Sequence, residues 1–273
     1  MLFDSHAHIN YEGYTDSERT GLMDLIEGSE VGFVLDVGFD LASSRQAVAD
    51  AASRDWCYAA VGIHPHDAGG VGAEDIDALR RLAREPKVLA IGEIGLDYYR
   101  DLSPRGEQRD AFKRQLALGL ELGLPITIHD RDSGGDTIEI LKTEGAFSDE
   151  RKRRFAPNPE TGILDARILL HCFSGSAEQA AEYIALGATI SIAGPVTYKN
   201  NKKTVGVAAA APLSHLLIET DAPYLTPEPK RGTKNDSTNV AYVARKIAEV
   251  RGLSYEEIAA ATMANAKRFL NIQ

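Results

Sequence analysis

Short apolar runs alternate with longer amphipathic segments along the whole chain. The runs with strand character span Leu2–His8, Gly32–Gly38, Cys57–His64, Val88–Asp97, Pro125–Asp130, Arg167–Phe173, Ala188–Ala193 and Leu216–Asp221. Several are nearly continuous in Val, Ile and Leu, which is typical of parallel strands buried on both faces. Helical periodicity is clearest in Glu74–Glu85, Gly106–Leu122, Ala177–Leu186 and Val240–Val250. Gly123 and Gly187 follow two of these segments, where a helix-ending glycine belongs.

This alternation predicts the α/β class and a (β/α)8 TIM-like barrel. An open doubly wound sheet would place a glycine-rich phosphate turn after its first strand. The first strand here ends in His6-Ala7-His8 instead, which favours the barrel. Barrels of this kind commonly have roughly 250 residues, so we expect one domain over residues 1–273.

One compositional break interrupts the pattern, a basic insertion at about residues 147–162 (Phe147–Gly162). It contains four consecutive basic residues, Arg151–Arg154, followed by Pro157-Asn158-Pro159. If the preceding helix follows strand five, the insertion lies at the N-terminal face of the barrel, away from the active-site face. We therefore interpret it as a solvated insertion rather than a nucleic-acid patch.

Composition narrows the classes of function. The chain has 40 acidic and 30 basic residues, a formal charge of −10, and 44% hydrophobic residues. This is ordinary for a globular protein and excludes coating of nucleic acid or membrane through surface charge alone. No apolar run approaches the roughly 20 residues of a spanning helix. With a strand beginning at Leu2 and only two cysteines, we expect no signal peptide and a cytoplasmic location.

Ionisable side chains close five of the predicted strands. His6 and His8 alternate on one side of the first strand, and the others are Glu93, His129, His171 and Asp221. In a barrel, the C-terminal strand ends meet at one mouth. A single histidine there could be an ordinary core residue, but so many buried imidazoles and carboxylates without a metal would be poorly paired.

This set is large enough for two divalent ions. Four histidines, one glutamate and one aspartate exceed the needs of a single tetrahedral centre. A carboxylate such as Glu93 can offer one oxygen to each of two ions. Mixed imidazole and carboxylate ligands suit Zn, Mn, Fe or Co better than a site for Mg alone. We expect one or two divalent ions, with Mg, Mn and Zn left open.

At this point the motifs resemble a known family, the TatD-type metal-dependent hydrolases of the amidohydrolase superfamily, which are deoxyribonuclease-like. The resemblance runs from Leu2 to about Leu270. It rests on His6-Ala-His8, Gly62-Ile-His-Pro-His66, Gly92-Glu93-Ile-Gly-Leu-Asp97, His129, His171-Cys-Phe-Ser-Gly175, Ala193-Gly-Pro-Val-Thr197, Glu219-Thr-Asp-Ala-Pro-Tyr-Leu225 and Asn265-Ala-Lys-Arg268.

The resemblance implies a ligand assignment. His6, His8, Glu93 and Asp221 would hold one ion, and Glu93, His129 and His171 the other. The chain departs from the family in its long insertion and in the glycine pair of Arg131-Asp-Ser-Gly-Gly-Asp136.

The catalytic candidates are Glu93 and Asp221, with Asp221 as the proton acceptor. His64, Arg131 and Arg231 are candidates for substrate phosphate. The alternatives are equally good: a purely structural hydrogen bond for His64, a surface ion pair for Arg131 and a solvated loop for Arg231. Further candidates support the ligands from behind: Glu219, on the side of Asp221, and Asp4, beneath His6. Cys172 should point outward into the core.

These residues favour a metal-dependent DNase acting through an activated water. The resemblance alone implies a 3′–5′ exonuclease on single-stranded DNA. One alternative keeps the metals but cleaves an ester or amide, as a D-aminoacyl-tRNA deacylase does, and another is a metal-bound scaffold without activity. We expect DNA as the partner, a monomer, and neither a membrane nor a protein partner.

Overall fold

The structure is a computed structural model that describes residues 1–133 and 135–272. A parallel sheet of eight strands, hydrogen-bonded in the order β1 to β8, forms its centre. The strands are β1 (Leu2–Ala7), β2 (Val31–Val37), β3 (Cys57–Val61), β4 (Val88–Asp97), β5 (Ile126–Arg131), β6 (Ile168–Leu170), β7 (Thr189–Ile192) and β8 (Leu216–Ile218). The predicted TIM-like barrel is confirmed.

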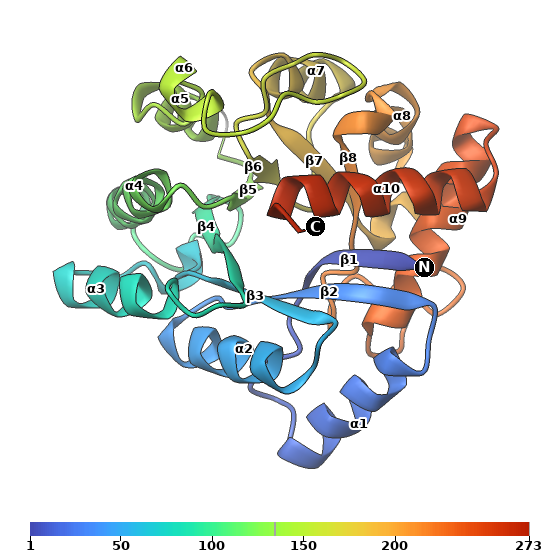
Figure 1. The fold of residues 1–273 in the computed structure, drawn as a ribbon, viewed down its shortest axis with the longest axis horizontal. Helices are drawn as coiled ribbons and strands as arrows, with labels where there is room; N and C mark the ends of the chain where they lie inside the picture. The colour runs from blue at the N-terminus through green and yellow to red at the C-terminus, as the bar shows by residue number, and fades with distance from the viewer. Residues whose placement is uncertain (134, 273) are drawn as a thin grey trace.

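Helices surround the ring of strands (Figure 1). The α-helices are α1 (Asp16–Glu27), α2 (Leu41–Ser53), α3 (Ala73–Leu82), α4 (Arg105–Leu122), α5 (Asp136–Thr143), α6 (Asp149–Lys152), α7 (Ala177–Ala185), α8 (Lys202–Ala210), α9 (Val240–Arg251) and α10 (Tyr255–Leu270). Short 3-10 helices are η1 (Pro65–Asp67), η2 (Gly194–Thr197), η3 (Leu213–His215) and η4 (Ser237–Asn239). Capping boxes begin α1, α2, α7 and α10. Gly123, with a φ of 70°, ends α4 as expected.

The barrel closes between β1 and the residues that follow β8. Ala7 forms a parallel bridge with Ala222, and the amide of His8 donates to the Ala222 carbonyl at 2.7 Å. The amide of Asp221 donates to the carbonyl of His6 at 2.9 Å. The closing seam therefore runs directly through residues predicted to bind metal.

The lower half of the barrel is apolar and is plugged by α10. Phe3, Leu169 and Leu217 cluster there with Ala266 and Phe269 of this helix. Figure 1 shows α10 crossing the ring of strands on the side facing the viewer. A second, larger apolar cluster fills the space between strands and outer helices. The upper half of the barrel is left for polar side chains.

The basic insertion lies at the N-terminal ends of the strands. Arg151 is buried and donates to the main-chain carbonyls of Leu124, at 2.6 Å, and Ala166, at 3.0 Å, just before β5 and β6. The interpretation of this run as solvated is therefore wrong for Arg151, whose guanidinium satisfies two strand-end carbonyls. Arg153 and Arg154 are exposed as expected.

Three strands end three residues earlier than their apolar runs predicted: β3 at Val61, β6 at Leu170 and β8 at Ile218. After β6 and β8 the backbone leaves the extended conformation, because Cys172 and Asp221 have positive φ angles of 43° and 55°. Within the described residues, no helix is both long and apolar enough to cross a membrane.

Candidate metal centre

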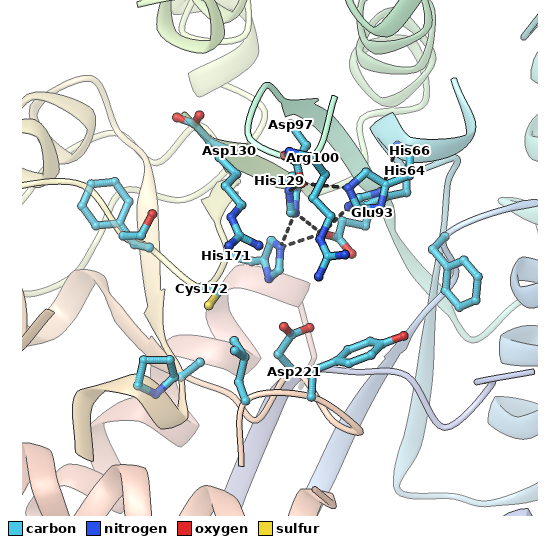
Figure 2. A pocket seen from close by; sticks show the side chains of 18 of the residues that line it. His64, His66, Glu93, Asp97, Arg100, His129, Asp130, His171, Cys172 and Asp221 are labelled. Atoms are coloured by element: carbon cyan, nitrogen blue, oxygen red, sulfur yellow. Dashed lines mark hydrogen bonds and ion pairs between the residues drawn. The ribbon is translucent and has the colours of Figure 1, made fainter. Parts of the chain in front are cut away.

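A pocket of about 820 Å³ opens at the C-terminal ends of the strands. Its lining includes residues from the predicted set: His8, His64, Glu93, His129, Arg131, His171 and Asp221. Figure 2 shows Glu93, His129 and His171 grouped on one side, with Asp221 facing them across the pocket. His6 is fully buried beneath the pocket and stacks on His171, with ring centroids 3.9 Å apart.

Glu93 lies at the centre of this group, and its two carboxylate oxygens face different histidines. Oε2 lies 3.4 Å from Nε2 of His6 and 3.7 Å from Nε2 of His8. Oε1 lies 2.6 Å from Nε2 of His171 and 2.7 Å from Nδ1 of His129. A carboxylate that divides its oxygens in this way has the arrangement needed to bridge two ions.

Asp221 completes the group around Oε2 of Glu93. Its Oδ1 lies 3.4 Å from Nε2 of His8 and 4.0 Å from Nε2 of His6. Three sets of side chains bring one ligand atom each within 4.8 Å of one another: His6, His8 and Glu93; His6, His171 and Asp221; and His64, Glu93 and His129.

The backbone of β4 and β5 must approach closely to build this site. Gly95 pairs with His129, and a Cβ on Gly95 would lie 2.0 Å from the carbonyl oxygen of His129. The φ of Gly95 is 147°, which L-residues rarely adopt. Glycine at this position therefore lets β5 hold the imidazole of His129 against Glu93.

His6 provides the test of whether these residues fit a metal. Both nitrogens of its ring are buried, and neither has a hydrogen-bond partner among the described residues. Burial and the neighbouring His171 lower the pKa of His6, which keeps the ring neutral with a free lone pair. A buried ring without partners is costly, whereas a metal ion would use that lone pair. The donor set fits a divalent ion.

The site balances negative and positive charge through its imidazoles. Burial opposes ionisation of Glu93, but His171 and His64 hold its pKa well below the usual range. Burial likewise opposes protonation of His8, yet Asp221 and Glu93 raise its pKa to about 9. The pKa of His171 also rises, against its burial, because it faces Glu93 and Glu219. Without a metal, protons on these imidazoles supply the positive charge that balances the carboxylates, and metal binding should release them.

A second layer of side chains orients the ligands. Oε1 of Glu219 lies 3.3 Å from Nδ1 of His171, and Ser191 donates to its other oxygen. Nδ1 of His8 lies 2.7 Å from the carbonyl of Val37. Such contacts fix the tautomer and the direction of a metal-binding imidazole. The structure thus places Glu219 in the position expected for a supporting residue.

Asp4 supports the barrel seam more than the ring of His6. Its carboxylate accepts hydrogen bonds from the amide of Thr220, at 2.9 Å, and from the Thr220 hydroxyl, at 2.6 Å. The main-chain nitrogen of His6 lies 3.4 Å from the same carboxylate. Asp4 therefore holds together the two chain segments that carry His6 and Asp221.

Sequence reasoning did not single out Asp97, which contacts two histidines. Its Oδ2 lies 2.8 Å from Nε2 of His66 and 3.2 Å from Nε2 of His129. The signal was present, because Asp97 ends the same predicted strand as Glu93, at an even spacing. Arg100, three residues further on, also went unnoticed, and Figure 2 shows it extending over the pocket.

The predicted substrate-binding residues occupy different environments. His64 is buried, with Nε2 3.5 Å from Oε1 of Glu93, and so joins the candidate ligands. Arg131 lines the pocket and stacks on Tyr99, with its guanidinium carbon 4.2 Å from the ring centroid. Arg231 lies outside the pocket lining and is exposed, its guanidinium stacked on Tyr198. Arg131 is therefore placed beside the pocket, whereas Arg231 is not among the residues that line it.

The expectation that Cys172 points outward is wrong. Cys172 lines the pocket (Figure 2). Its positive φ breaks the strand alternation on which the expectation depended. Burial and nearby carboxylates raise the pKa of its thiol well above the usual range, so it is a thiol rather than a nucleophilic thiolate. In the glycine pair near Arg131, Gly134 lies outside the described residues.

Comparison with known proteins places these features in context. The family model described as "TatD related DNase" matches residues 3–271. The chain is 42% identical over 272 residues to an uncharacterized metal-dependent hydrolase, YabD, of Bacillus subtilis, covering all of both chains. It is 34% identical over 248 residues, 89% of each chain, to an Erwinia tasmaniensis protein named "3′-5′ ssDNA/RNA exonuclease TatD".

A solved structure shows the same architecture. The TatD homologue YjjV from Escherichia coli K12 superposes with a TM-score of 0.85 at 27% identity, covering 100% of this chain and 98% of that one. The similarity in sequence and in structure therefore extends over the whole barrel, including the strand ends that carry the candidate ligands.

Proposed function

Because the chain belongs to the TatD family of metal-dependent hydrolases, we propose that it degrades single-stranded DNA from the 3′ end by hydrolysing phosphodiester bonds. One observation carries the chemistry of this proposal. The two oxygens of Glu93 face separate groups of imidazoles in a pocket open to substrate. The nuclease names of relatives such as the Erwinia protein support the choice of substrate.

The proposed ligand sets follow the two oxygens of Glu93. His6, His8 and Asp221, which lie on the Oε2 side of Glu93, would hold one ion with it, and His129 and His171, on the Oε1 side, would hold the other. His64 is a further ligand candidate on the Oε1 side. Mixed nitrogen and oxygen donors suit Zn, Mn, Fe or Co, and Mg remains a candidate for activity in the test below.

Divalent ions held here would lower the pKa of a water molecule and polarise a phosphoryl group. The side chains of the pocket have complementary tasks. The pKa of Asp221 lies below its usual range, despite burial, because of His8 and His171. Asp221 is therefore ionised at neutral pH and accepts the proton that hydrolysis releases. Arg100 and Arg131 lie at the rim, where guanidinium groups can hold the phosphate backbone.

The test is a nuclease assay on metal-free protein. Single-stranded DNA labelled at the 3′ end or the 5′ end is incubated after dialysis against chelator, with Mn, Mg or Zn added back separately. We expect metal-dependent release of mononucleotides from the 3′ end, lost in His171→Ala and in Asp221→Ala. His215→Ala is the matched control, because His215 is a buried histidine in η3, immediately before β8, at the opposite end of that strand from the site.

Two results would contradict the proposal. Release that persists in both ligand variants would separate the activity from this site. Tight binding of metal without cleavage of DNA under any condition would instead favour an ester or amide substrate, such as a D-aminoacyl-tRNA, and deacylation of that substrate would then be measured.

A further inference from the structure

Three tyrosines and a lysine form a cluster beside the pocket, which we call the aromatic platform: Tyr11, Tyr14, Tyr224 and Lys234. Tyr11 and Tyr14 follow β1, and Tyr224 and Lys234 follow β8. The ring centroids of Tyr11 and Tyr224 are 6.0 Å apart, and those of Tyr11 and Tyr14 are 5.5 Å apart. Nζ of Lys234 lies 3.6 Å from the centroid of Tyr14.

The platform is continuous with the candidate metal centre. Tyr224 lines the pocket three residues after Asp221, and its ring centroid is 6.2 Å from that of His8. The aromatic surface therefore begins where the candidate ligands end. A substrate whose phosphodiester occupies the pocket would extend over these rings on the Asp221 side.

The platform also has surface to offer a ligand. Tyr224 is 50% exposed. Tyr11 and Tyr14 are half-buried, so each ring of the platform keeps part of its surface open to a ligand.

The charges around the platform favour a base over a phosphate. Burial raises the pKa of Tyr14 and of Tyr224, and carboxylates add to the effect, Asp236 and Glu18 at Tyr14 and Glu12 at Tyr224. Three carboxylates outside the candidate ligand set thus lie around the platform, against one lysine, Lys234. A phosphate would be repelled here, while the neutral face of a nucleobase would not. The guanidinium groups of Arg100 and Arg131 lie elsewhere on the pocket lining and would attract the phosphates.

Resting on the proposed function, we infer that the aromatic platform stacks a nucleobase of the single-stranded substrate next to the scissile phosphodiester. Every base has a π-face, so stacking on aromatic side chains tolerates any sequence. Bases within a duplex are already stacked on one another and cannot occupy the platform without unpairing. The platform would therefore select single-stranded ends without reading their sequence.

The experiment measures binding separately from cleavage. Fluorescence anisotropy in chelator follows the wild type and its variants with labelled oligothymidylate and with an oligomer of equal length whose 3′-terminal residues are abasic. Tyr224→Leu removes the aromatic face next to the pocket, and Tyr224→Phe keeps it. Tyr255→Leu is the matched control, because Tyr255 begins α10 at the opposite end of the barrel.

We expect the wild type to bind oligothymidylate about 5-fold to 150-fold more tightly than the abasic oligomer, the range for base–aromatic stacking. Tyr224→Leu should lose most of this ratio, while Tyr224→Phe and Tyr255→Leu should retain it. The platform proposal would be overturned if Tyr224→Leu kept the wild-type ratio of affinities for oligothymidylate and the abasic oligomer. It would also be overturned if Tyr224→Phe lost this ratio as fully as Tyr224→Leu.

The nuclease assay shows which proposal fails. Cleavage of DNA with no preference for bases over abasic residues would overturn the platform and leave the proposed function standing. Base-dependent binding without cleavage by any metal-loaded sample would support the platform and overturn the nuclease. Neither binding nor cleavage would overturn both.

Discussion

Replacing Gly95 with alanine would test how closely β4 and β5 must approach to place His129. The added Cβ would lie 2.0 Å from the carbonyl oxygen of His129, and real Cβ contacts essentially never fall below 3.0 Å. The two strands must therefore separate by about 1 Å at this pair. The contact is with main chain rather than with a flexible side chain, so no rotamer change can relieve it.

The cost has two parts that add. Overpacking of this kind typically costs about 1–3 kcal/mol, and alanine at a φ of 147° costs about a further 1–3 kcal/mol. The lower entropy of the unfolded chain returns less than about 1 kcal/mol. We expect the free energy of unfolding to fall by about 2–5 kcal/mol, and the Tm by about 5–15 °C.

Displacement of His129 should also weaken metal binding. Its Nδ1 lies 2.7 Å from Oε1 of Glu93, and metal–ligand distances tolerate only about 0.2 Å of error. A movement several times larger should lower, at least tenfold, the protein's affinity for the ion that His129 and His171 would hold. Urea unfolding and metal titration against a chromophoric chelator would measure both effects.

Gly106→Ala is the matched control for this substitution. Gly106 lies in the first turn of α4, where an added Cβ meets nothing within 4 Å. Alanine there should raise the free energy of unfolding by about 0.5–1 kcal/mol. If Gly95→Ala matched the wild type in both stability and metal affinity, the close approach of β4 and β5 could not be what positions His129.

Three further predictions follow from single contacts. Glu93→Ala should lose at least one ion and lower kcat at least 1000-fold. Its far-ultraviolet circular dichroism should remain that of a folded barrel. Retained turnover would refute the two-ion site. Burial raises the pKa of Asp36 well above its usual range, and Asp50 adds to the effect. The folded protein therefore keeps a proton that the unfolded chain releases, so the free energy of unfolding falls as the pH rises above about 4. Asp36→Asn should flatten this fall in urea midpoints of metal-free protein from pH 4.5 to 8, and identical slopes would contradict it. Arg151→Leu removes a buried guanidinium from the carbonyls before β5 and β6. The free energy of unfolding should fall by about 2–4 kcal/mol, while kcat stays unchanged. A kcat that falls together with stability would place the insertion in the catalytic machinery.

The barrel and most of its candidate ligands could be predicted because both depend on strand alternation. A buried parallel strand is recognisable by its apolar run, and a polar residue at its C-terminal end has only the mouth of the barrel to occupy. His6, His8, Glu93 and His129 lie within such strands or one residue beyond. Their convergence requires no knowledge of side-chain angles.

Alternation fails where the backbone leaves the strand, and the sequence carries no rule for that point. The positive φ of Cys172 turns its thiol toward the pocket, although its odd spacing from His171 predicts the opposite side. His64 follows β3 in a non-strand segment, so its approach to Glu93 could not be read from a period of two. The aromatic platform is harder still to predict from the sequence, because it joins two loops more than 200 positions apart in the chain.

The division of the barrel interior explains why loss of a ligand need not unfold the protein. The apolar lower half and α10 form a buried hydrophobic cluster inside the ring, and burial of apolar surface is the dominant favourable term in folding. The upper half holds ionisable groups whose mutual contacts compensate for their desolvation without adding much net stability. Removing Glu93 therefore relieves one buried charge while leaving the imidazoles free to become neutral. Stability is built at one end of the barrel and chemistry at the other, which is why the Glu93→Ala experiment can separate them.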